Sequence, residues 1–162
     1  MRHQLYIDFV WLGCYGLLYL ALSYLLAWRN CPWARYLSWM AAICGAGAAA
    51  FDVRENLGML QVVNDPAISQ SMLAALHIRD AAIVKWTLSF VTMGLLAVTF
   101  YGLDKKLSRI GFFFTLTALA GGVGLWYKPL LGLLVPLPML IGLVLLSYTA
   151  WRSPQVFREP SA

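Results

Sequence analysis

Charged residues are scarce in this chain. Asp, Glu, Lys and Arg make up only 12% of its 162 residues, whereas an average soluble domain has about a quarter. Hydrophobic residues make up 61% and occur in long blocks that short charged segments separate. A membrane-spanning helix needs about 20 mostly apolar residues, and several blocks are that long. The composition therefore argues against an ordinary soluble domain and predicts an all-α membrane protein.

Cysteine and histidine are also rare, which limits the metal and redox chemistry open to the chain. The three cysteines, Cys14, Cys31 and Cys44, form no C-x-x-C pair, so no disulfide framework is predicted. The two histidines, His3 and His77, are isolated in the sequence, whereas haem and soft-metal sites usually need better-spaced ligands. We therefore expect no cofactor and no bound metal.

The net charge of +5 does not indicate a nucleic-acid partner. The basic residues stand singly or in pairs at the ends of apolar blocks, without a basic stripe interleaved with aromatics. This placement is typical of orientation signals and lipid headgroup contacts. We expect membrane lipids as partners, a homodimer or a larger membrane complex as an open alternative, and no nucleic acid.

Apolar blocks and helix-breaking residues predict a bundle of five transmembrane helices. The expected spans cover residues 5–28, 36–62, 81–103, 110–127 and 129–151. The run from Ile110 to Trp151 is too long for one span, so we divide it at Lys128-Pro129. Four spans are the alternative if the weakest block is re-entrant. The spans and their loops, residues 1–152, form one transmembrane domain, and residues 153–162 are expected to be a flexible cytoplasmic tail.

The third helix can also begin before residue 81, with Asp65 and Pro66 as its cap and first turn. The first block is read as a retained helix, because Asp8 interrupts the apolar region that a signal peptide requires. Pro136 and Pro138 predict a kink or local unwinding in the last span.

Lysine and arginine in the short loops predict the orientation. Seven basic residues fall on one side of the membrane and three on the other: Arg29, Arg35, Lys105, Lys106, Arg109, Arg152 and Arg158 against Arg2, Arg79 and Lys128. The side richer in basic residues is expected to be cytoplasmic. The N-terminus is then outside and the C-terminus inside, as an odd number of spans requires.

The segment AAAFDVRENLGML, residues 48–60, places charges inside the second span. Asp52, Glu55 and Asn56 have i, i+3 and i+4 spacing, so they share one helix face, while Arg54 points elsewhere. At about 1.5 Å per residue, Asp52 lies about 24 Å from the cytoplasmic end of the span, in its outer half. A charge at the bilayer centre costs at least about 2.5 kcal/mol, so the acids should face the bundle interior. Lys85 of the next span is their best counter-ion.

Two interpretations of these residues stay open. They form either an electrostatic clamp between two helices or an outer-facing polar pocket, with a subunit interface as a third reading. The candidate ligand-binding residues are Asp52, Arg54, Glu55, Asn56 and Lys85. A pocket would bind or move a lipid-like amphiphile, a small solute or an ion. The alternatives are an intramembrane enzyme on a lipid-like substrate, with Asp52 or Glu55 as general acid or base, and an accessory subunit of a membrane complex.

Small residues precede the charged segment in CGAGAAA, residues 44–50. Gly45 with Ala49, and Ala46 with Ala50, have the spacing that lets another helix approach closely. We expect this close approach to occur within the chain, with homodimerisation as the alternative.

The pattern AG-x-x-x-FD-x-x-EN, followed by a lysine early in the next span, resembles that of a group of small bacterial inner-membrane proteins. The matching residues are Ala46, Gly47, Phe51, Asp52, Glu55, Asn56 and Lys85. The resemblance covers the second and third spans. It implies a multi-pass protein of the bacterial inner membrane and no particular activity.

Overall fold

The computed structural model of the chain describes residues 2–28, 31–65, 68, 71–103, 105–127 and 135–153. Within these residues the secondary structure is entirely helical, which confirms the predicted all-α class. The helices are α1 (Arg2–Ala27), α2 (Pro32–Asn64), α4 (Met72–Leu103), α5 (Lys105–Trp126) and α7 (Pro136–Arg152). Four of them, α1, α2, α4 and α5, are long and apolar enough to cross a membrane, and α7 is apolar but shorter.

The helix α4 starts earlier than residue 81, and the predicted cap is wrong. Asp65 has an extended backbone and is the C-cap of α2, with its N–H bonded to the carbonyl of Gln61. The helix α4 begins only at Met72. The charges of its first turns lower the local hydropathy, but they do not stop a helix that packs against α2.

Pro136 and Pro138, which predicted a kink or local unwinding, lie in the first turn of α7. Proline is tolerated there because a first-turn N–H has no partner within the helix. The remaining part of the expected fifth span, residues 129–134, lies outside the described residues. The same holds for Arg29, Lys128, Arg158 and residues 154–162 of the expected tail.

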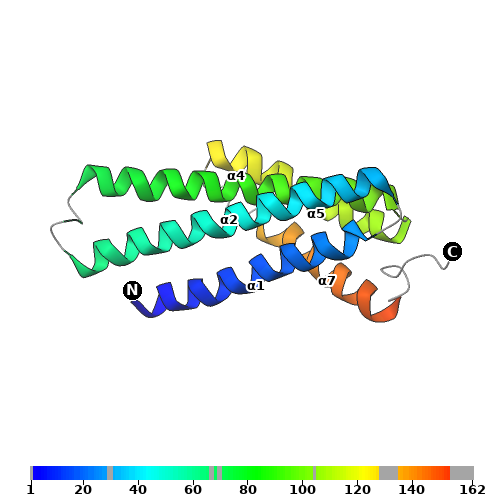
Figure 1. Ribbon diagram of the computed structural model, residues 1–162, viewed down its shortest axis with the longest axis horizontal. Coiled ribbons are helices and arrows are strands. Elements are labelled where there is room, and N and C mark those ends of the chain that lie inside the picture. The colour runs from blue at the N-terminus through cyan, green and yellow to red at the C-terminus, as the bar shows by residue number, and fades with distance from the viewer. Residues whose placement is uncertain are drawn as a thin grey trace.

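Each helix packs against its neighbours in chain order: α1 on α2, α2 on α4, α4 on α5, and α5 on α7. The helices α2 and α4 form an antiparallel hairpin that stays in contact along its length. Trp33 packs on Gly102 near one end, and Gly58 faces Ile78 near the other. The hairpin extends beyond α5 and α7 on the side where its two helices are connected (Figure 1). We call this side the hairpin end. We call the opposite side the basic end, because Arg35, Lys105, Arg109 and Arg152 lie there.

Gly121 fixes where α5 stops relative to the hairpin. It lies against the ring of Phe90 in the antiparallel helix α4. Trp126, the last residue of α5, follows Gly121 by five residues. Lys85 precedes Phe90 by five residues in the antiparallel helix α4. The helix α5 therefore ends near the level of Lys85, and the hairpin continues past it.

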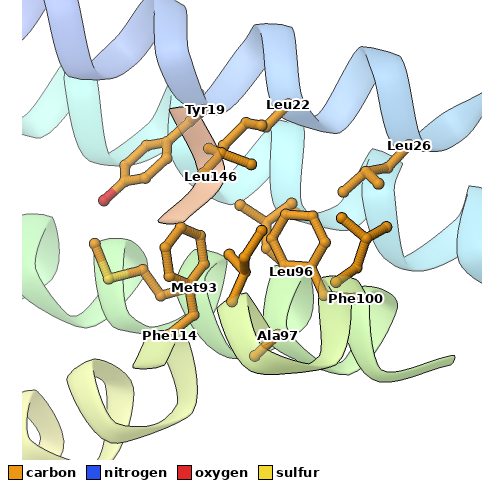
Figure 2. Close-up of a cluster of buried hydrophobic side chains, with 12 residues drawn as sticks. Tyr19, Leu22, Leu26, Met93, Leu96, Ala97, Phe100, Phe114 and Leu146 are labelled. Carbon is orange, nitrogen blue, oxygen red and sulfur yellow. The ribbon is translucent and has the colours of Figure 1, made fainter. Parts of the chain in front are cut away.

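The core lies in the half of the bundle towards the basic end, where side chains from all five described helices meet (Figure 2). The close-up shows Tyr19, Leu22 and Leu26 of α1 opposite residues of α4, with Phe114 of α5 and Leu146 of α7 beside them. Small residues bring the helices close to this core. A Cβ atom on Gly45 would lie 3.0 Å from Tyr19 of α1, and one on Gly47 would lie 3.1 Å from Leu88 of α4. Gly45 and Gly47 thus serve packing within the chain, whereas Ala46 and Ala50 are exposed.

Candidate functional site

A lysine lies between two carboxylates at the junction of α2 and α4. The Nζ atom of Lys85 donates a hydrogen bond to Oδ1 of Asp52 at 3.1 Å and lies 2.5 Å from Oε2 of Glu55. The three side chains are only 14%, 11% and 10% exposed, in that order. Asp52 and Glu55 are almost one helical turn apart, so one ammonium group reaches both. The structure therefore contains the ion pair that the helical spacing predicts.

The helix α1 contributes a phenol that the sequence analysis missed. The hydroxyl of Tyr15 in α1 donates to Oδ2 of Asp52 at 2.5 Å. Both carboxylate oxygens of Asp52 therefore have a partner, one from α1 and one from α4. The ring of Tyr15 packs edge-on against that of Tyr19, with centroids 5.7 Å apart. Its only signal in the sequence is a polar-ended aromatic in the middle of the first apolar block.

Asn56 is a buried amide that directly follows Glu55 in α2. It is only 3% exposed, and its Nδ2 atom has no hydrogen-bond partner in the part of the chain that the structure describes. Leaving such a buried donor unpaired costs about 1–3 kcal/mol. We call Tyr15, Asp52, Glu55, Asn56 and Lys85 the carboxylate cluster.

The cluster is not balanced in formal charge. Two carboxylates and one ammonium leave one negative charge. The Nζ atom of Lys85 also lies 5.2 Å from the ring of Trp86, so this cation is held on several sides. The cluster can therefore accept a further group that carries a positive charge or donates hydrogen bonds.

Arg54 does not belong to the cluster. It is exposed and lines a groove on another face of α2, together with Gln61 and His77. Asp8 is exposed on α1, and Arg79 forms an exposed ion pair with Asp80 at 3.6 Å. Of the five predicted site residues, the structure thus joins Asp52, Glu55 and Lys85 by ion pairs, buries Asn56 on the same face of α2 and separates Arg54. Within the described ranges, no three His, Cys, Asp or Glu residues lie close enough to hold a metal ion.

An apolar cavity lies next to Tyr15, the member of the cluster from α1. It has a volume of about 220 Å³ and lies among α1, α4, α5 and α7. Its lining residues are Cys14, Tyr15, Leu18, Tyr19, Leu22, Met93, Phe114, Met139 and Leu143. The ring of Tyr15 forms part of this wall, while its hydroxyl reaches Asp52. One side chain therefore joins the apolar cavity to the buried charges.

Exposed tryptophans lie at both ends of the part of the bundle that separates the basic end from the cluster. Trp33 lies at the basic end, and Trp126 lies near the level of Lys85. From Trp33 to Asp52 the helix α2 rises about 28 Å at about 1.5 Å per residue. The hydrocarbon core of a bilayer is about 30 Å thick, and tryptophan prefers its two boundaries. A bilayer with one boundary at Trp33 would therefore have its other boundary near the cluster, at the hairpin end.

Comparisons with known proteins add no relative: no family model, no curated protein and no solved structure matches the chain. The fold and the cluster define the class only as an all-α bundle with four helices able to cross a membrane. Its function has to be argued from the geometry.

Proposed function

We propose that this protein binds a lipid-like amphiphile that enters from the bilayer. The apolar part of the ligand occupies the cavity among α1, α4, α5 and α7, and the polar part reaches the carboxylate cluster. The observation that carries the proposal is the position of Tyr15, which lines the cavity and bonds to Asp52. An apolar cavity with a few convergent polar groups at one side is the usual form of a small-molecule site.

The size of the cavity supports a partial insertion. Its volume is about 220 Å³. An apolar cavity of about 150 Å³ is enough to bind benzene, while drug-sized sites begin at about 300 Å³. The cavity therefore fits a ring or a short stretch of an alkyl chain, and the rest of the ligand stays in the bilayer.

The charge of the cluster supports a particular polar group. Its net negative charge attracts an amine or another cationic group, and the Nδ2 atom of Asn56 offers a hydrogen bond to an acceptor beside that group. A single-chain amine is the simplest ligand with these properties. A bare ion is less well supported, because Lys85 already occupies the space between the two carboxylates.

The proposal includes a membrane topology. We propose five crossings in a bacterial inner membrane, with the N-terminus outside and α7 as part of the fifth crossing. The location follows the resemblance of the AG-x-x-x-FD-x-x-EN pattern. The orientation is supported by exposed basic residues that gather at one end of the described helices: Arg35, Lys105, Arg109 and Arg152. The hairpin end and the carboxylate cluster then lie towards the outside.

Filling the cavity tests the proposed function. Leu18→Trp places a large ring in the cavity, whereas Leu119→Trp adds the same ring to an exposed position of α5. The probe is dodecylamine, added to protein in mild detergent, and the measurement is the bound fraction by native mass spectrometry. We expect Leu18→Trp to lower retention about tenfold, equivalent to about 1.4 kcal/mol, and Leu119→Trp to leave it unchanged. Equal retention by both variants, each with an unchanged unfolding temperature, would contradict the proposal.

A further inference from the structure

A second site lies on the far face of the helix that carries the cluster. A groove of about 560 Å³ lies along α2 and the start of α4 at the hairpin end. Its residues in α2 include Ala50, Arg54, Leu57 and Gln61, at i, i+4, i+7 and i+11. This spacing forms one stripe along the helix, opposite to the stripe of the carboxylate cluster. The groove and the cavity beside Tyr15 share no residue.

The groove has a positive rim over an apolar floor. Its polar lining residues are Arg54, Gln61 and His77, all exposed, and no acidic residue lines it. Among the residues that the structure describes, Arg54 forms no ion pair. The remaining wall is made of small and aliphatic residues: Ala50, Val53, Leu57, Gly58, Ala74 and Ile78. A positive charge over apolar side chains is complementary to an amphiphile with an anionic head.

The depth of the groove identifies the amphiphile. Arg54 is between Asp52 and Glu55 in the sequence, so with the bilayer placed as above the rim lies at the hydrocarbon boundary, next to the layer of lipid phosphates. The floor at Ala50 lies one turn deeper in the bilayer, where acyl chains begin. A guanidinium group binds phosphate oxygens through two parallel hydrogen bonds, and a soluble anion would make no use of the apolar floor.

We infer that this groove binds an anionic phospholipid, with its phosphate at Arg54 and its upper acyl chain along the apolar floor. The site is separate from the proposed amphiphile site in position and opposite to it in charge. The inference shares the placement in a membrane with the proposed function but not the amphiphile site, because Leu18→Trp leaves the groove intact and Arg54→Gln leaves the cavity intact.

The test compares two lipids on the full chain. Protein in mild detergent receives equal amounts of phosphatidylglycerol and phosphatidylcholine with the same acyl chains, and native mass spectrometry measures which is retained. We expect a preference for phosphatidylglycerol that Arg54→Gln lowers about fivefold, since one basic residue near a membrane surface contributes about 1 kcal/mol of attraction to anionic lipid. The matched control is Arg79→Gln, which removes the same charge from an exposed position of the same hairpin outside the groove.

Three results would overturn the inference. The first is equal retention of the two lipids by the unaltered chain. The second is an equal loss in Arg79→Gln, which would show a general effect of surface charge. The third is displacement of phosphatidylglycerol by millimolar inorganic phosphate, which would show that the groove takes free phosphate. A preference that survives phosphate, disappears with Arg54→Gln and persists with Arg79→Gln supports the lipid site.

Discussion

At the scale of single residues, the cluster is held by one cation shared between two anions. A buried carboxylate is stable near the bilayer only when a counter-charge or hydrogen-bond donors replace water. Asp52 has both, through Lys85 and Tyr15, whereas Glu55 has the ion pair alone. The Oε2 atom of Glu55 has no aligned hydrogen bond in the described part of the chain. Glu55 is therefore the member of the cluster most dependent on Lys85.

This dependence predicts the effect of removing the lysine. Lys85→Met leaves two neighbouring carboxylates without their cation, and we expect a loss of about 3 kcal/mol in the free energy of unfolding in detergent. Adding Glu55→Gln to Lys85→Met should recover part of this loss, because one of the two uncompensated charges is then absent. Lys105→Met, which removes an exposed lysine at the basic end, is the control and should change stability little. If Lys85→Met unfolds at the same denaturant concentration as the unaltered chain, the cluster contributes nothing to stability.

The sequence predicts most of this residue-scale arrangement and misses one part of it. Helical periodicity places Asp52, Glu55 and Asn56 on one face and turns Arg54 away, and the structure agrees with both. Tyr15 could not be predicted, because its contact with Asp52 depends on the register between α1 and α2. No local pattern in an apolar helix sets that register; close packing such as that of Gly45 against Tyr19 sets it.

At the scale of helices, hydropathy locates the long apolar helices but not their ends. The helices α2 and α4 have 33 and 32 residues. At about 1.5 Å per residue each is about 50 Å long, well beyond a hydrocarbon core of about 30 Å. The excess lies at the hairpin end, where α4 already begins at Met72 (Figure 1). A helix continues past the bilayer as long as its partner helix continues to pack against it, and no sequence window contains that information.

Glycine sets the distance between α4 and α5, and two adjacent glycines allow a matched test. A Cβ atom on Gly121 would overlap the ring of Phe90, whereas one on Gly122 would meet nothing within 4 Å. Gly121→Ala should therefore lower the free energy of unfolding by about 1–3 kcal/mol through overpacking. Gly122→Ala should raise it by up to about 1 kcal/mol, because alanine is the better helix former. Thermal unfolding followed by circular dichroism measures both, and equal effects of the two substitutions would mean that α5 does not pack on α4 as described.

At the scale of the whole molecule, the orientation of the chain in a membrane decides which side the carboxylate cluster faces. The carboxylate cluster and the groove at Arg54 both lie towards the hairpin end, so the side of that end decides which leaflet would supply the two proposed ligands. The sequence predicts the all-α class and the four long apolar helices, because apolar blocks of sufficient length fold in few other ways. Orientation depends instead on a small difference in loop charge, and part of that charge lies on residues outside the described ranges, such as Arg29 and Lys128.

Cysteine labelling from one side of the membrane checks the orientation. Cys31 directly precedes α2 at the basic end, and Asn64 is the exposed last residue of α2 at the hairpin end. In a background with Cys14→Ser and Cys44→Ser, one variant keeps Cys31 and the other has Cys31→Ser with Asn64→Cys. With the N-terminus outside, a membrane-impermeant maleimide should label Asn64→Cys in intact cells and Cys31 only after the membrane is opened. The reverse pattern would place the N-terminus inside and give both sites to the inner leaflet. Labelling of both variants in intact cells would mean that no membrane separates the two ends of α2, which contradicts a spanning hairpin.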